Sequence, residues 1–170
     1  MITTPDRPAA SPDPKNCPAE VSRTLHDFIV SFNDALGTVD RQRLKPYRDQ
    51  IAGTDNQLAA DKRAAYMCAD WLIRTYTPAF LRLAGLGQHA DALASAGEVV
   101  DLATLGQVND CISAADSTAR SAARSAADSA ADSAADSAAE QGLAPAVAAL
   151  QASAFGLLDR MIATYTIAAA

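Results

Sequence analysis

The sequence has few of the residues on which metal sites and large aromatic cores depend. Only 5% of its 170 residues are aromatic, and it contains two histidines and three cysteines. The thiols of Cys17, Cys68 and Cys111 are far apart and form no CxxC pair. Neither His26 nor His89 stands at metal-ligand spacing from them. We therefore expect reduced, buried cysteines and no metal site.

Several sequence motifs that identify a type of catalysis or a cofactor are also absent. The chain has no GxSxG, P-loop, HExxH or Gly-rich dinucleotide loop, so no cofactor is expected. Its start, MITTPDRPAASPDP, has neither the basic nor the apolar part of a signal peptide, and no stretch reaches the ~18 consecutive apolar residues of a membrane span. A net charge of -6 argues against a phosphate-binding surface. The sequence predicts a soluble, cytoplasmic protein that binds neither nucleic acid nor membrane.

What the chain does contain is helical periodicity. Alanine supplies much of its 49% hydrophobic content, and no window alternates in the manner of a strand. The spacing of Val21, Leu25, Phe32 and Leu36 predicts an amphipathic helix that starts at Pro18 and is capped by Gly37. The fold class that follows is all-α.

Further helices are expected along the rest of the chain. One or two short turns should lie between residues 38 and 53, and a longer helix should start near residue 54 and run through Leu58, Leu72 and Tyr76. Pro78 should break or kink that helix, and a short helix should follow at 88–95. Pro145 should open a last helix, with its inner side formed by Val147, Leu150, Ala154, Leu157, Leu158, Met161 and Tyr165.

Between these helices lies a low-complexity run, SAARSAADSAADSAADSAAE, at 121–140. With Asp101 as N-cap, it predicts one very long Ala/Ser-rich helix over about 101–141. Its serines recur every fourth residue, and each step turns the row by ~40°, so the row winds around the helix and does not form a coiled-coil seam. Such a helix would be ~60 Å long, against ~40 Å for a compact domain of this size. Either it breaks near Gly106, or its end projects, or another chain covers it.

The domain organisation expected from these patterns is simple. Residues 1–16 carry four prolines among small polar residues and read as a disordered, Pro-rich tail. Residues 17–167 read as a single helical domain, a helical bundle that includes the long helix.

Two groups of residues are candidates for function. Asp128, Asp132, Asp136 and Glu140 form an acidic row suited to a basic protein partner. A second polar cluster combines Asp70, Arg74 and His89. The first two stand four apart on one helical face, where a salt bridge is expected, and a surface or capping role is the simpler reading of the histidine. No catalytic residue is assigned.

The segment around this cluster resembles a known group of proteins. CADW at 68–71 is followed by Arg74, by TP at 77–78, by QHADAL at 88–93 and by the closing AVAALQASAFGLLDRMI. Over roughly 60–165 this order is similar to alanine-rich proteins of actinobacteria and their phages, and distantly to the Imm5-like family of predicted immunity proteins of polymorphic toxin systems. The repeats here lack the interleaved tryptophans and tyrosines of that family. The resemblance implies an antitoxin role and carries over no catalytic residue.

Three classes of function follow. The leading interpretation is a non-enzymatic helical protein that acts through protein–protein contact, in particular as an immunity protein against a basic toxin. The alternative is a structural protein that forms a homodimer through the long Ala-rich helix. A small helical enzyme that uses Asp70, Arg74 and His89 is the third.

Overall fold

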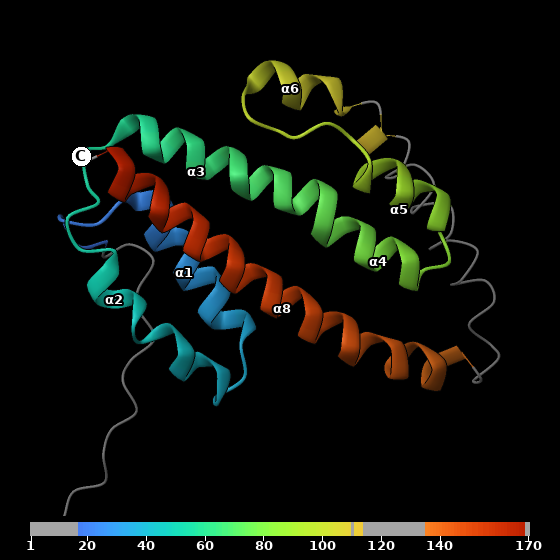
Figure 1. Ribbon diagram of the computed structural model, residues 1–170. Helices are drawn as coiled ribbons and strands as arrows, with labels where there is room; N and C mark the ends of the chain where they lie inside the picture. The colour runs from blue at the N-terminus through green and yellow to red at the C-terminus, as the bar shows by residue number, and fades with distance from the viewer. Residues whose placement is uncertain (1–16, 110, 114–134, 169–170) are drawn as a thin grey trace, which may run out of the picture. The chain divides into compact units, whose positions relative to one another are not determined.

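The computed structural model describes residues 17–109, 111–113 and 135–168. These residues contain helices and no strand, which confirms the all-α prediction (Figure 1). The chain divides into two compact units, residues 1–56 and 57–170, while the single domain over 17–167 stays a prediction and the tail at 1–16 lies outside the described residues. The elements are α1 (Arg23–Ala35), the 3₁₀ helix η1 (Asp40–Leu44), α2 (Tyr47–Gln50), α3 (Leu58–Trp71), the π-helical turn η2 (Leu72–Tyr76), α4 (Thr77–Leu83), α5 (Gly87–Ala94), α6 (Leu102–Gln107) and α8 (Ala135–Ala168).

The first unit is organised around the start of α1. Ser22 is its N-cap: the Oγ of Ser22 accepts a hydrogen bond from the Leu25 N–H at 3.3 Å. The backbone N–H of Ser22 donates to Thr54 Oγ1 at 3.0 Å, and both side chains are buried. The helix therefore begins at Arg23, later than the predicted Pro18, because a capping hydroxyl satisfies an N–H of the first turn only at that point.

The same unit closes on itself after α2. The Gly53 N–H donates to the carbonyl of Glu20 at 2.9 Å, and Gly53 has a φ of 78°, which favours glycine. The two short helical elements before it confirm the turns predicted between 38 and 53. The buried apolar residues of this unit are Val21, Leu25, Val30, Phe32, Leu36 and Leu44.

In the second unit, α3, η2 and α4 follow one another without a break. The Thr77 N–H donates to the carbonyl of Leu72, five residues back, as in a π-helix. Pro78 then falls in the first turn of α4, directly after this π-helical turn. The break predicted at Pro78 therefore does not occur: the chain stays helical across the proline, with a π-helical turn directly before it.

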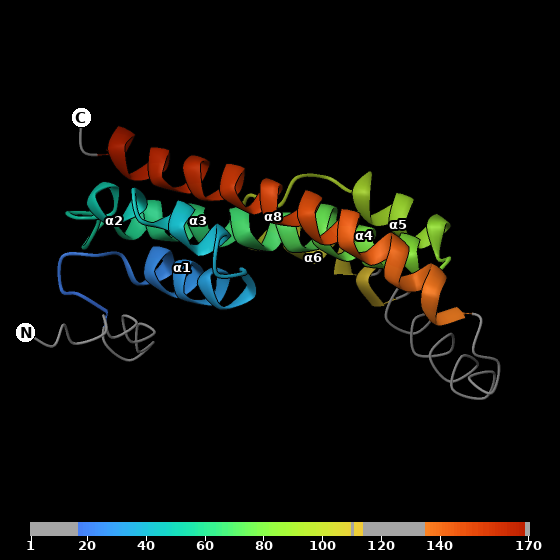
Figure 2. The ribbon, with the colours of Figure 1, turned by 90° about the horizontal axis from the view of Figure 1, so that it is seen from below.

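The long helix α8 lies alongside α3 in the opposite direction (Figures 1 and 2). Tyr165 Oη donates to Asp61 Oδ1 at 2.7 Å near one end, and Trp71 Nε1 donates to Ser153 Oγ at 2.9 Å further along. The predicted inner side of the last helix is confirmed: every residue of it is buried except Val147, which is half-buried.

The turn between α4 and α5 is capped by Gly85, whose φ of 73° is left-handed. The Gly85 N–H donates to the Arg82 carbonyl at 3.1 Å and the Leu86 N–H to the Leu81 carbonyl at 2.8 Å, the two bonds of a Schellman motif. This turn folds α5 back onto α4 around a buried cluster of Leu81, Ala90 and Leu93, against which Ile73, Leu86, Cys111 and Ile112 pack.

The predicted very long helix over about 101–141 is not what the described residues form. Asp101 caps α6 as expected, but α6 ends at Gln107, directly after the weak helix former Gly106. The helix α8 begins at Ala135 and continues past Gly142 and Pro145, although a new helix was expected to start at Pro145. A proline within a helix removes one backbone hydrogen bond, and α8 continues through Pro145 in spite of this loss. Residues 114–134 lie outside the described residues.

Candidate functional site

The salt bridge predicted between Asp70 and Arg74 is present and partly buried. Nε of Arg74 donates to Oδ1 of Asp70 at 2.7 Å, and Nη2 donates to Oδ2 at 3.0 Å. Only 20% of the Asp70 side chain and 32% of the Arg74 side chain are exposed. This two-pronged geometry is the strong form of a carboxylate–guanidinium pair.

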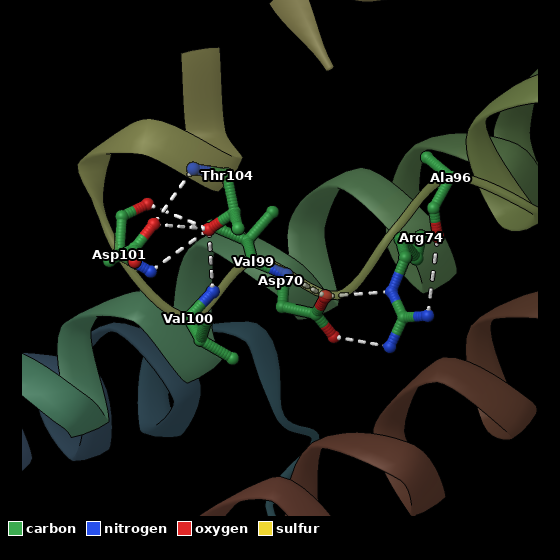
Figure 3. A network of polar contacts seen from close by, with 7 residues as sticks. All are labelled: Asp70, Arg74, Ala96, Val99, Val100, Asp101 and Thr104. Carbon is green, nitrogen blue, oxygen red and sulfur yellow. Dashed lines mark hydrogen bonds and ion pairs between the residues drawn. The ribbon is translucent and has the colours of Figure 1, made fainter. Parts of the chain in front are cut away.

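The pair holds a loop, residues 95–101, against the helix (Figure 3). Oδ1 of Asp70 also accepts the backbone N–H of Val99 at 2.9 Å, and Nη1 of Arg74 reaches the carbonyl of Ala96 at 3.5 Å. The side chain of Val99 is buried, with 2% exposed. Asp70 and Arg74 therefore act together as a clamp on the segment that leads from α5 to α6.

The loop is stabilised again where it enters α6. Oδ1 of Asp101 accepts the Thr104 N–H at 2.7 Å, and Thr104 Oγ1 accepts the backbone N–H groups of Val100 and Asp101, both at 3.0 Å (Figure 3). This is a capping box, with threonine in the position often held by glutamate. The hydrogen bond from the Thr104 backbone lowers the pKa of Asp101. The contribution of the cap to stability is therefore complete above the ordinary pKa of an aspartate, and it is lost as the pH falls from there through the lowered pKa.

The chemistry of the clamp is that of a structural ion pair. Both carboxylate oxygens of Asp70 accept hydrogen bonds, and the hydrogen bond with Asp70 raises the pKa of Arg74. A guanidinium bound in this way keeps its charge and cannot act as an acid or a base. The arrangement positions the backbone of the loop.

His89 does not join this cluster. It lies half-buried in α5, and no described residue gives it a hydrogen bond or ion pair. Its neighbour Asp91 accepts instead from Nη2 of Arg82 at 2.8 Å, across the α4–α5 turn. The structure thus brings together two members of the predicted cluster and leaves the third apart.

The predicted acidic row falls where little of the chain is described. Asp128 and Asp132 lie outside the described residues. Asp136 and Glu140 lie in the first turns of α8, and the description there extends to the backbone only. The partner-binding role of the row stays a prediction.

Sequence reasoning missed a row of aromatic rings on the α3–α4 side of this unit. The rings of Trp71 and Tyr76 have centroids 5.4 Å apart, and those of Tyr76 and Phe80 are 4.9 Å apart. Leu72 and Tyr76 belong to η2 and are exposed, although their helical spacing from Leu58 had suggested a buried apolar face. The TP dipeptide at 77–78 is the sequence feature closest to this row. It indicates a disturbance of the helix, but it does not predict a π-helical turn before the proline.

Cys68 lies half-buried in α3, where its Sγ is 3.6 Å from Sδ of Met161. Burial raises its pKa from the ordinary 9.0 to about 11, so the reactive thiolate is scarce near neutral pH. The neutral thiol favours the folded state below pH 9, and that contribution is lost as the pH rises towards 11.

We expect Cys68 to react with iodoacetamide at about pH 8 far more slowly in the folded protein than in guanidinium chloride, because folding suppresses its thiolate. Peptide mapping by mass spectrometry measures the rate at this position. Equal rates in the folded and unfolded protein would contradict the burial of this thiol.

Two further properties of the described residues bear on function. Within them, no group of three or more His, Cys, Asp or Glu side chains is placed to hold a metal ion. One helical segment, Leu143–Thr166, is long and apolar enough to cross a membrane by length and composition, a test that core helices of soluble proteins also pass.

Comparison of the chain with protein-family models, curated proteins and solved structures yields no significant match.

Proposed function

We propose that this protein acts through contact with another protein and not through catalysis. The observation that carries the proposal is the exposure of large apolar side chains on the second unit, in particular Leu58, Leu72, Leu83 and Leu102. Exposed apolar surface of this kind is typical of protein-interaction sites. The polar cluster that a small helical enzyme would use is engaged in holding a loop, which favours the interaction role.

The specific role we propose is that of an immunity protein in the cytoplasm, bound to a basic toxin. The resemblance of 60–165 to the Imm5-like family supports it, as does the acidic row Asp128, Asp132, Asp136 and Glu140, which would attract a basic partner. Unpaired thiols at Cys17, Cys68 and Cys111 support the proposed location, because oxidising compartments favour disulfides.

Co-expression tests this role. We expect the protein to restore growth of cells that produce the toxin encoded by a neighbouring gene, and a variant with the four acidic residues changed to asparagine and glutamine to restore it less. The charge-neutral variant should keep the melting temperature of the wild type, which serves as the control for folding. Failure of rescue with every neighbouring gene product would overturn the immunity role.

Self-association is the second candidate. The homodimer expected through the Ala-rich helix stays a prediction, and the exposed side chains of Leu58, Leu72 and Leu83 are a further apolar surface that would suit a second copy of the chain.

A further inference from the structure

The aromatic rings of Trp71, Tyr76 and Phe80 form a continuous row, which we call the ring row. The centroids of neighbouring rings are 5.4 Å and 4.9 Å apart. The π-helical turn brings Trp71 and Tyr76 together, because residues five apart are neighbours in a π-helix. Phe80 then follows Tyr76 after one turn of α-helix. The ring row is therefore a product of the π-helical turn.

The ring row is fixed in place and open to solvent in its middle. Nε1 of Trp71 donates to Ser153 Oγ at 2.9 Å, and Ser153 Oγ donates to the Leu150 carbonyl at 2.9 Å, so the indole ring is held against α8. Trp71 and Phe80 are half-buried, whereas Tyr76 is 39% exposed. Within the part of the chain that the structure describes, no residue is hydrogen-bonded to the Tyr76 hydroxyl. The row thus offers apolar ring surface together with one available donor.

Surfaces lined with aromatic rings are the docking sites of proline-rich segments in the polyproline II conformation. Such a segment has no internal hydrogen bonds, so its carbonyls can accept from a group such as the Tyr76 hydroxyl. One polyproline II turn advances ~9 Å along its axis. The ring row has a similar extent, because the rings of Trp71 and Phe80 each lie about 5 Å from Tyr76.

The chain itself contains a segment of this chemistry. Residues 5–14 read PDRPAASPDP. Residues three apart lie on the same edge of a polyproline II helix, which places Pro5, Pro8 and Pro14 on one edge and Pro12 on another. Pro5 and Pro8 are one turn apart, so their rings are spaced to cover the two ends of the ring row.

We infer that the ring row binds residues 5–14 of the same chain as a polyproline II segment. Pro5 and Pro8 cover the rings of Trp71 and Phe80, and the Tyr76 hydroxyl donates to a backbone carbonyl between the two prolines. This contact goes beyond the proposed function, because it needs no toxin.

The tether to the folded part of the chain favours this segment over a proline-rich segment of another molecule. Cys17 is the first residue that the structure describes, and the chain between Pro8 and Cys17 spans up to ~30 Å when extended. A segment tethered in this way acts at an effective concentration of the order of millimolar. Even a weak affinity for the ring row is then enough to keep the segment bound.

The NMR signal of the Trp71 indole N–H tests the contact in the full chain, and it is a single signal because Trp71 is the one tryptophan. We expect Pro5→Ala/Pro8→Ala to shift it, because both prolines that cover the ring row are lost. Pro12→Ala is the matched control, since it removes a proline from another edge and should leave the signal in place. No shift in the double variant, or an equal shift in Pro12→Ala, would overturn the inference.

A synthetic peptide of residues 1–16 tests the same contact without the tether. Titrated into the full-chain variant Pro5→Ala/Pro8→Ala, it should return the indole signal to its wild-type position, at concentrations of the order of millimolar. The peptide with both prolines replaced by alanine should leave the signal unchanged. Failure of the wild-type peptide to move the signal, or equal binding of the two peptides, would contradict the proposed contact.

Variants of Tyr76 test whether the ring row is the binding site. In a Tyr76→Ala chain that keeps its melting temperature, replacing Pro5 and Pro8 should no longer shift the indole signal. Tyr76→Phe keeps the ring and removes only the hydroxyl, so this variant serves if the alanine variant does not fold. In the Pro5→Ala/Pro8→Ala background it should bind the peptide about 2- to 10-fold more weakly, the value of one hydrogen bond. Unchanged proline effects or peptide affinity in these variants would place the segment elsewhere.

Dilution distinguishes the segment of the same chain from that of a second copy. A contact within one chain keeps the wild-type indole signal at the same position over a wide range of protein concentration. A wild-type signal that moves on dilution towards that of Pro5→Ala/Pro8→Ala would assign the segment to a second copy and overturn the inference.

Discussion

Replacing Leu93 by alanine is expected to lower the free energy of unfolding of the second unit by about 2–5 kcal/mol. Leu93 is 2% exposed and packs with Leu81 and Ala90 in the cluster that joins α4 and α5. Alanine removes most of the buried side chain and leaves a cavity, and the surrounding helices are held by the Gly85 turn and cannot fully close it.

Urea denaturation measures this change, with the fluorescence of Trp71 as the signal, since it is the one tryptophan of the chain and lies in the second unit. Leu102→Ala is the matched control: the same atoms are removed from a side chain that is 72% exposed, and the expected change is within about 0.5 kcal/mol. A similar loss in both variants would mean that the Leu93 cluster is not a packed core.

Asp70→Asn is expected to lower the free energy of unfolding by about 1–3 kcal/mol, because it removes the counter-charge of a partly buried guanidinium. The amide keeps the shape of the carboxylate and one acceptor oxygen. It cannot accept from Nε and Nη2 of Arg74 and from the Val99 N–H at the same time, as the carboxylate does. The loop at 95–101 should therefore loosen.

Hydrogen exchange at the Val99 amide, measured beside the urea midpoint, reports this loosening directly. Asp91→Asn is the matched control, because it breaks the Arg82–Asp91 pair, whose side chains are 50% and 75% exposed. An exposed pair of this kind contributes about 0–1 kcal/mol, and Val99 should stay protected. Unchanged protection of Val99 in Asp70→Asn would contradict the clamp.

Asp70→Asn also tests the third class of function, a small helical enzyme. A small enzyme that used Asp70 catalytically would lose activity in Asp70→Asn without a loss of stability. The contacts of Asp70 predict the reverse, a loss of stability that accompanies any loss of function. His89→Ala provides a second test of the enzyme hypothesis. His89 is not part of the clamp, so its removal should leave both stability and partner binding unchanged.

The sequence predicted several elements correctly. The inner side of α8, the cap at Asp101 and the short helix α5 follow from helical spacing and local capping chemistry, both of which act over a few residues. Helical spacing also grouped Leu58, Leu72 and Tyr76, and only the structure shows that all three are exposed to solvent. Periodicity identifies an apolar face without stating which surface covers it.

What the sequence by itself determined is therefore the helical class, the short turns, the capping residues and the Asp70–Arg74 pair, because each depends on residues at most a few positions apart. The tertiary structure alone decided that this pair clamps Val99, twenty-nine residues away in sequence, and that α8 runs through Pro145. It also decided that small residues such as Ala60 and Ala64 face the core while leucines remain exposed. The reason is physical: burial and long-range hydrogen bonds depend on where distant helices pack, and an alanine-rich chain offers many nearly equivalent ways to pack them.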